Sequence, residues 1–395
     1  MTTLNDTNIN DVQTTEDVGI YETFESMGLS ENIMKGIYAF GFEKPSAIQQ
    51  KAIVPFMTGR DLIAQSQSGT GKTATFVIGM LQQLDENDKG LQAIILVPTR
   101  ELAKQINDVV TGLCTYTKYK VNLVIGGAKR QKYSYGYDDE YQILVGTPGR
   151  LSEMVAKKSI DPSNLKVLIM DEADEMLSFG FREQMVKILN KIPKKTQIGL
   201  FSATIPEEMM KITTKFMNNP IKILIKTSEV TLEGIKQYYI VIENDEDKFD
   251  CLCDLYSTIR VTQSIIYVNH KSTVDWLSKN LAEKDFTVGS ISGGMLHEER
   301  NDVMVKFRAG DIRVLISTDL LSRGIDVQQV SLVLNYDIPH EKETYIHRIG
   351  RSGRFGRKGV AVNFVNQKDY SKFKAIIDHY ETTIQEMPEN ISSIM

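Results

Sequence analysis

Short apolar runs alternate with longer amphipathic stretches along this chain, and that alternation limits its fold more than any other feature. Apolar, often β-branched runs flanked by polar turns are typical of parallel strands covered on both faces, although periodicity alone leaves short buried helices open for some of them. The clearest runs occupy residues 93–97, 143–145, 167–170, 198–201, 264–268, 314–317, 332–335 and 360–364. The pattern predicts an α/β fold of mostly parallel sheets flanked by helices.

The predicted strands fall into two sets, which indicates two domains in a chain whose 395 residues exceed one ordinary core. Residues 226–234 lie between the sets, are polar and contain a glycine, so we interpret them as a linker. The first domain is then predicted at residues 21–225 and the second at residues 235–395. Residues 1–20 are rich in Asn, Thr and Asp without periodicity, which predicts a disordered tail.

Composition narrows the class of protein. Hydrophobic residues make up 42% and charged residues 25%, no apolar run approaches the roughly 18 residues of a membrane helix, and the polar start indicates no secretion signal. The three cysteines belong to no cluster with zinc spacing, so we expect free thiols in a reducing compartment. The net charge of −5 disfavours a general nucleic-acid coat, so any nucleic-acid site must be local. The candidate is an acid-free stretch that holds Arg348, Arg351, Arg354, Arg357 and Lys358.

Polar segments, some with glycine or proline, directly follow several predicted strands. In the first domain they are residues 98–100 (PTR), 146–150 (GTPGR), 171–172 (DE) and 202–204 (SAT). The carboxyl ends of parallel strands meet at the same edge of a sheet and present ligand sites there. Four such segments therefore predict an extended site along one edge of the first domain.

Residues 66–73 (SQSGTGKT) come close to a phosphate-binding loop, although the general pattern has glycine in place of the first serine. Gly69 and Gly71 would let backbone amides face a phosphate at the start of a helix. Lys72 would then neutralise phosphate oxygens and the Thr73 hydroxyl would bind Mg²⁺; the alternative is a plain glycine-rich turn from strand to helix. The predicted nucleotide-binding residues of the loop are Ser66, Gln67, Ser68, Gly69, Thr70, Gly71, Lys72 and Thr73.

Two acids, Asp171 and Glu172, stand at the tip of the predicted strand at residues 167–170. Buried acids are costly unless a cation or hydrogen bonds receive them. We interpret Asp171 as a Mg²⁺ ligand, direct or through water, and Glu172 as the group that orients and deprotonates an attacking water. Acid pairs also cap helices, so this motif takes its meaning from the phosphate-binding loop that precedes it.

With these residues in place, the chain resembles the DEAD-box RNA helicases from about residue 21 onward. Residues 41–49 (GFEKPSAIQ) resemble the family's adenine-recognition motif, which implies that Phe42 stacks on the base and that Gln49 hydrogen-bonds to its edge. Further motifs follow in the family's order at residues 98–103, 126–127, 147–150, 171–174, 202–204, 317–319, 323–326 and 347–354. Residues 214–220, 231–238 and 326–334 more narrowly resemble the initiation factor 4A subfamily.

The resemblance implies two RecA-like domains, with ATP in the cleft between them and RNA lying across both. Arg351 and Arg354 of the second domain would stabilise the charge on the departing γ-phosphate, and Asp326 would contact the ribose. The residues that would link the γ-phosphate to domain closure are Ser202 and Thr204, with Asp171, Asp174 and His347.

The resemblance also implies contacts to the RNA backbone. Such residues suit phosphates and 2′-hydroxyls rather than base edges, so little sequence specificity is expected. The matching positions are Thr99, Arg100, Gly127, Thr147 and Arg150 in the first domain, and Arg300 and Thr318 in the second. Thr99 and Arg150 could equally cap helices, and Arg357 and Lys358 are better interpreted as solvated surface.

Two functions use these same residues. The first is an ATP-dependent RNA helicase that hydrolyses ATP and locally unwinds RNA in mRNA translation initiation; the alternative is an ATP-locked RNA clamp of the exon-junction type. Intact Lys72, Glu172, Arg351 and Arg354 favour turnover, and Gln49 disfavours a DNA-translocating relative. The resemblance implies a cytoplasmic monomer, or a nuclear one under the alternative, with a helical scaffold partner of the initiation factor 4G type.

His297 stands three residues before Arg300, where the family normally has glutamine. A glutamine would orient the arginine, whereas the charge of a histidine titrates near neutrality. We therefore expect RNA-stimulated ATPase activity to change modestly between about pH 6 and pH 7.5. The pH profiles of the wild type and of His297→Gln check this, and identical profiles reject it.

Overall fold

The structure is a computed structural model that describes residues 12–66, 69–126, 141–177, 180–225, 235–259, 261–319, 330–352 and 359–388. These residues form two compact units, of which the first ends at Ile225 and the second begins at Ile235. The predicted linker at residues 226–234 lies outside the described residues. Among the helices within these ranges, none is long and apolar enough to cross a membrane.

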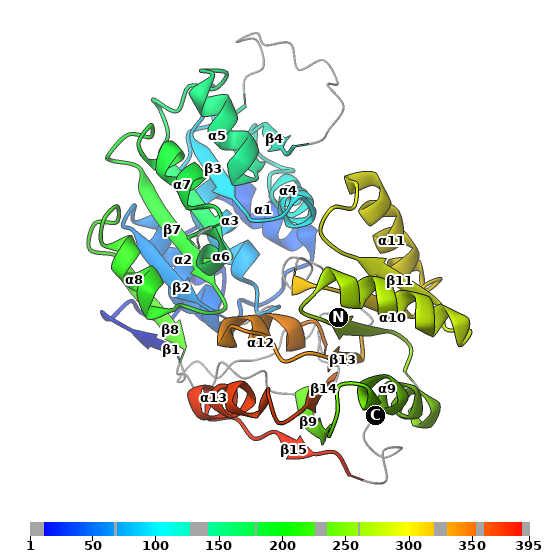
Figure 1. Cartoon of the computed structure of the whole chain (residues 1–395). Coiled ribbons are helices and arrows are strands. Elements are labelled where there is room, and N and C mark those ends of the chain that lie inside the picture. Colours follow the sequence, from blue (N-terminus) through cyan, green and yellow to red (C-terminus); the bar gives the residue numbers. More distant parts are fainter. Residues whose placement is uncertain are drawn as a thin grey trace. The chain divides into compact units, whose positions relative to one another are not determined.

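A mostly parallel sheet forms the centre of the first unit (Figure 1). Its strands, in spatial order, are β1 (Val12–Thr14), β8 (Ile221–Ile225), β2 (Leu62–Gln65), β7 (Gln197–Ser202), β6 (Val167–Asp171), β3 (Ala93–Leu96), β5 (Ile143–Gly146) and β4 (Val121–Val124). All of these neighbours pair in parallel except β1 with β8. The carboxyl ends of the parallel strands therefore share one edge.

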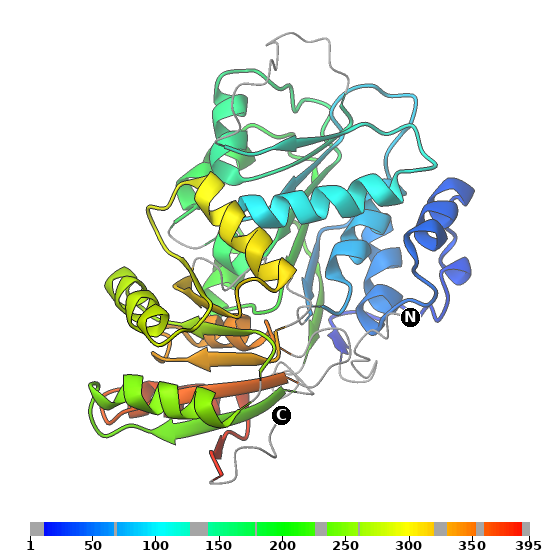
Figure 2. The same cartoon turned by 90° about the vertical axis from the view of Figure 1, so that its right-hand side faces the viewer.

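Helices cover both faces of this sheet (Figure 2). Successive strand residues point to opposite faces, so Ile95 and Ile169 join one core whereas Ile94 and Leu168 join the other. The first core includes residues of α1 (Glu31–Phe40), α2 (Ala47–Met57), α3 (Lys72–Leu81) and α4 (Arg100–Leu113), and the second includes residues of α5 (Pro148–Ala156), α6 (Ala173–Met176), α7 (Arg182–Leu189) and α8 (Glu207–Thr213). This double cover explains why the strands read as continuous apolar runs.

The second unit repeats this architecture with a parallel sheet. Its strands, in spatial order, are β11 (Val288–Ile291), β12 (Val314–Ser317), β10 (Ser264–Tyr267), β13 (Leu332–Asn335), β14 (Gly359–Val365), β9 (Ile235–Val241) and β15 (Gln385–Glu386). One core includes residues of α9 (Asp247–Thr258) and α10 (Lys271–Glu283), and two further cores include residues of α11 (His297–Ala309), α12 (Lys342–Ile349) and α13 (Tyr370–Tyr380).

The predicted fold class, mostly parallel sheets flanked by helices, is confirmed in both units. All eight predicted strands are present, each within one residue of its predicted ends. The strands β4 (VNLV) and β11 (VGSI) lack a pure apolar run, because each contains a polar residue or a glycine and lies at an edge of its sheet. Edge strands need fewer apolar contacts, so an apolar pattern reveals them poorly. The interior strands β2, β8 and β9 are also not among the predicted runs, and β8 and β9 each contain a lysine.

The prediction of a disordered tail through residue 20 is wrong for residues 12–16. Strand β1 pairs with β8, and the side chain of Val12 is 5% exposed. The Arg60 guanidinium donates to both carboxylate oxygens of Glu16, at 2.6 and 2.8 Å. These contacts come from residues far along the chain, so the polar composition of the segment does not reveal them.

Candidate functional site

Three of the predicted motifs meet at the carboxyl edge of the first sheet. The strands β2, β7 and β6 are neighbours, so the phosphate-binding loop, the SAT segment and the acids at residues 171–174 follow adjacent strand ends. The backbone N–H of Ser66 extends the pairing by donating to the carbonyl of Ser202 at 3.0 Å. The sheet topology thus brings together segments that lie more than a hundred residues apart in the sequence.

The phosphate-binding loop turns through two glycines with left-handed backbone. Gly69 has φ +86° and Gly71 has φ +99°, and helix α3 begins directly after Gly71 at Lys72. The Ser66 hydroxyl, which occupies the position of the general pattern's glycine, is buried and hydrogen-bonded to the Thr70 hydroxyl. Gln67 and Ser68 lie outside the described residues. The first amides of α3 therefore form the helix N-terminus that the sequence predicts for phosphate binding.

Two opposite charges are buried next to this loop. Lys72 is 7% exposed, and among the described residues its Nζ has no hydrogen-bond partner. Burial, together with the neighbouring Glu172 carboxylate, raises the pKa of Asp171 to about 7 against the opposing effect of the Lys72 ammonium. A buried ammonium without a hydrogen-bond acceptor fits an anionic phosphate, and a buried carboxylate with a raised pKa fits a cation. The residues present therefore match a phosphate and its magnesium ion, with Thr73 in the first turn of α3.

Glu172 has a strained backbone. Its φ and ψ are both 52°, which is the left-handed region that a non-glycine residue rarely adopts. Its N–H donates to Oδ1 of Asp171 at 3.0 Å, and its side chain is buried. The turn sends the chain from β6 directly into α6 and so fixes where the second acid lies relative to the first.

Asp174, the last of residues 171–174, accepts hydrogen bonds from two hydroxyls of the SAT segment. Ser202 Oγ donates to Oδ1 of Asp174 at 2.8 Å, and Thr204 Oγ1 donates to Oδ2 at 2.6 Å. One carboxylate thus joins the segment after β7 to the helix after β6. The structure brings Ser202 and Thr204 together with Asp174 as the resemblance implied, while their part in domain closure stays a prediction.

Gln49 braces the phosphate-binding loop, a role that sequence reasoning missed. Its side chain is fully buried, Oε1 accepts the N–H of Ser46 at 2.8 Å, and Nε2 donates to the carbonyl of Gly71 at 3.3 Å. The spacing of serine and glutamine around the start of α2 is a capping-box signal that could have indicated the first bond. Phe42 is half-buried and its ring stacks on that of Phe40.

A cleft of about 360 Å³ lies at the same edge of the first unit, at the ends of β3, β4 and β5. Its lining residues are Pro98, Arg100, Gly126, Thr147, Gly149, Arg150, Glu153 and Phe181. Three predicted RNA contacts, Arg100, Thr147 and Arg150, therefore converge on one cleft, whereas Gly127 lies outside the described residues.

Helix capping, the alternative to an RNA contact, is present for Thr99 but not for Arg150. Thr99 caps helix α4, because its Oγ1 accepts the N–H of Leu102 at 3.2 Å. Arg150 does not cap a helix but pairs with Glu153 one turn later, at 2.7 Å. A partly exposed pair of this kind contributes little to stability, so it does not by itself exclude an RNA contact for Arg150.

In the second unit, the described candidates lie on separate elements. Thr318 follows β12, Arg300 lies on α11 with a buried Nε that has no hydrogen-bond partner in the described part of the chain, and Arg351 follows α12. Nε of Arg351 donates to the carbonyl of His347 at 3.1 Å. Arg354, Asp326 and the side chain of His297 lie outside the described residues. The structure therefore leaves the predicted roles of Arg354 and Asp326 as predictions.

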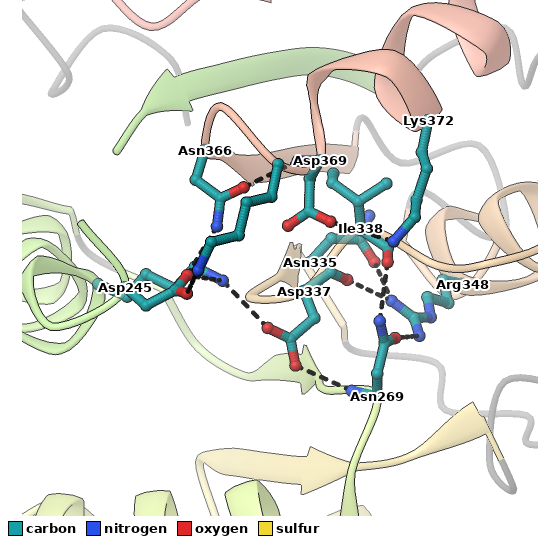
Figure 3. Close-up of polar contacts among 11 residues, drawn as sticks. Asp245, Asn269, Asn335, Asp337, Ile338, Arg348, Asn366, Asp369 and Lys372 are labelled. Carbon is teal, nitrogen blue, oxygen red and sulfur yellow. Dashed lines mark hydrogen bonds and ion pairs between the residues drawn. The ribbon is translucent and has the colours of Figure 1, made fainter. Parts of the chain in front are cut away.

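Arg348 corrects the interpretation of the basic stretch as a nucleic-acid surface. Its side chain is 0% exposed, lies 5.3 Å over the Tyr267 ring and forms an ion pair with Asp319 at 2.5 Å. Figure 3 shows it pointing toward Asn335 and Asn269, to which it donates at 3.3 and 2.9 Å. A cation with this many partners is structural, so charge along the sequence overstates the basic surface.

Comparisons with known proteins match almost the whole chain to one family. Residues 46–212 match the model of the DEAD/DEAH box helicase family, and residues 247–356 match the helicase conserved C-terminal domain. The chain is 51% identical to the ATP-dependent RNA helicase eIF4A of Scheffersomyces stipitis over 97% of this chain and 96% of that protein. It is 50% identical to eukaryotic initiation factor 4A of Caenorhabditis elegans over 95% and 94%.

A solved structure of an RNA-bound protein has a fold similar to that of this chain. S. cerevisiae Dbp5 bound to RNA and ADP BeF3 has a TM-score of 0.86 and 38% sequence identity, covering 93% of this chain and 96% of that one.

Gly71 should be more sensitive to substitution than Gly69. A Cβ on Gly71 would come within 2.6 Å of Gln49 Nε2, whereas one on Gly69 would meet nothing within 4 Å, and both residues have positive φ. We expect Gly71→Ala to lower the free energy of unfolding by about 1–3 kcal/mol and to weaken ATP binding more than Gly69→Ala does. Urea denaturation and ATP titration of both variants measure this, and equal losses would contradict the bracing role of Gln49.

Arg348→Ala should destabilise the second unit by about 2–5 kcal/mol, because it empties a fully buried site and removes the donor to the oxygens of Asn335 and Asp337. The matched control is Lys374→Ala, which removes an exposed cation from α13 of the same unit and should cost less than about 0.5 kcal/mol. Urea denaturation followed by circular dichroism separates the two. A stable Arg348→Ala protein with weaker RNA binding would restore the nucleic-acid interpretation.

Proposed function

The chain belongs to the DEAD/DEAH box helicase family and is an ATP-dependent RNA helicase of translation initiation with two RecA-like domains, and we propose how its residues share that work. The relatives of about half identity are named as initiation factor 4A, so the exon-junction alternative is not favoured. The observation that carries the proposal is the buried Lys72 ammonium beside Asp171 at the start of α3.

ATP binds at the carboxyl edge of the first sheet. The amides that begin α3 and the Lys72 ammonium hold the phosphates, and Phe42 and Gln49 recognise the adenine. Gln49 already uses one lone pair and one N–H within the protein, which leaves one acceptor site and one donor for the base. Thr73 and Asp171 would hold Mg²⁺, which supplies positive charge to the phosphate oxygens.

Glu172 orients and deprotonates the attacking water. Its strained backbone places a buried carboxylate directly beside Asp171, at the edge of the sheet where the phosphates are proposed to bind. Ser202 and Thr204 act through Asp174, whose two oxygens their hydroxyls occupy. Arg351 and Arg354 of the second unit stabilise the charge that develops on the leaving phosphate, and Asp326 contacts the ribose.

RNA lies along the cleft at the ends of β3, β4 and β5. Arg100, Thr147 and Arg150 line this cleft, where helices α4 and α5 also begin. Guanidinium groups, hydroxyls and helix N-termini are suited to phosphates rather than to base edges, which fits a helicase that accepts many sequences. Thr99, Gly127, Arg300 and Thr318 extend the contact on the family's pattern.

The family names of the relatives support the cellular setting. We propose that the protein acts in the cytoplasm as a monomer and that a helical scaffold of the initiation factor 4G type regulates it.

The test is steady-state ATPase activity with and without RNA for the wild type and Glu172→Gln. RNA should stimulate the wild type, and the variant should lose at least about a hundredfold in rate while keeping ATP-dependent RNA binding, because only the proton acceptor is removed. The control Glu183→Gln makes the same charge change at an exposed position of α7 and should retain full activity. Equal stimulation by DNA and RNA would contradict the RNA assignment.

A further inference from the structure

Phe40, two positions before Phe42, packs between the Phe42 ring and Gly112 of helix α4. We propose that Phe40 is a positioning residue for the base of ATP, which holds the Phe42 ring in the plane that stacks on adenine, and that Gly112 of α4 exists as glycine to admit it. This inference rests on the proposed contact between Phe42 and adenine.

The turn between the two aromatic residues is fixed by the backbone. Phe40 is the last residue of α1, Gly41 follows with φ +97°, and the N–H of Phe42 donates back to the carbonyl of Ile37 at 3.1 Å. A left-handed glycine at this point is a common helix stop that reverses the chain. As a result, side chains 40 and 42 emerge on the same side of the turn.

The rings of Phe40 and Phe42 stack on one another. Their centroids are 5.3 Å apart and their planes differ by 23°, which is the offset-stacked geometry that aromatic pairs favour. Phe42 is half-buried, whereas Phe40 is 41% exposed despite being a large apolar side chain. Burial in the core therefore does not explain the position of the Phe40 ring, whereas its stacking on Phe42 does.

The seat of Phe40 lies on helix α4. A Cβ on Gly112 would come within 2.5 Å of both Cδ2 and Cε2 of Phe40, so any larger residue there must displace the ring. One turn earlier in α1, a Cβ on Gly36 would meet the Leu113 carbonyl oxygen at 2.3 Å. Gly36 and Gly112 thus let α1 and α4 approach closely, and the contact with α4 holds the Phe40 ring in place.

A ring held in one plane loses little conformational freedom when a base stacks on it, so binding costs less. Phe40 acts on the base alone, since the phosphates are held by α3 and Lys72. Its removal should therefore lower affinity for ATP without changing affinity for inorganic tripolyphosphate. An effect on overall stability would instead lower both affinities together.

The experiment measures the Kd of the full chain for Mg·ATP and for inorganic tripolyphosphate, together with kcat, KM and the melting temperature. Phe40→Ala should raise Kd and KM for ATP about two- to tenfold, leave kcat and the Kd for tripolyphosphate unchanged, and be rescued by Phe40→Tyr. Gly112→Ala should shift the ATP affinity in the same direction. The double variant should be no worse than Phe40→Ala, because both changes act through one ring.

Two controls separate this inference from its premise. Tyr116→Ala removes another exposed aromatic ring of the same unit and should leave both affinities unchanged. Phe42→Ala should weaken ATP binding; if it does not, the adenine contact itself is wrong. If Phe42→Ala weakens ATP binding but Phe40→Ala leaves it unchanged, tightens it or weakens tripolyphosphate equally, the positioning role of Phe40 is overturned and the adenine contact stands.

Discussion

The Lys72 ammonium and the Asp171 carboxylate are buried at the end of a parallel sheet, and the rest of the first unit must hold them there. Burying a charge is expensive unless hydrogen bonds or an opposite charge receive it. Lys72 has no hydrogen-bond partner among the described residues, and burial raises the pKa of Asp171 to about 7. The sheet, the helices over both its faces and the braced loop hold these groups in an unfavourable state that the proposed phosphate and Mg²⁺ would relieve.

Arg348 shows the opposite arrangement with a similar charge. It is as deeply buried, but it is paired with Asp319 and surrounded by amide and carbonyl oxygens. A buried cation with satisfied donors needs no ligand to explain it, whereas one without hydrogen-bond partners calls for an explanation such as a bound anion. Hydrogen-bond satisfaction, rather than charge or burial, therefore separates Arg348 from Lys72, the cation that we propose to bind phosphate.

Residues of the nucleotide site also hold one another in place. Gln49 joins the start of α2 to the carbonyl of Gly71, and Asp174 joins the segments after β6 and β7. Each link therefore fixes the positions of two elements relative to one another. In the same way, the ring of Phe40 stacks on Phe42 and lies against Gly112, so it links Phe42 to helix α4.

The sequence by itself indicated eight of the strands, because a strand covered on both faces is apolar and reads as such, but it did not indicate the interior strands β2, β8 and β9. It also indicated the glycine turn at residues 69–71 that leads into α3 and the acids at the end of β6, because these signals lie within a few residues of one another. The edge strands, the pairing of β1 with β8, the bracing by Gln49 and the burial of Arg348 were decided only by the tertiary structure. Each depends on a partner tens or hundreds of residues away, and no local pattern encodes whether a polar side chain will find that partner or remain open to a ligand.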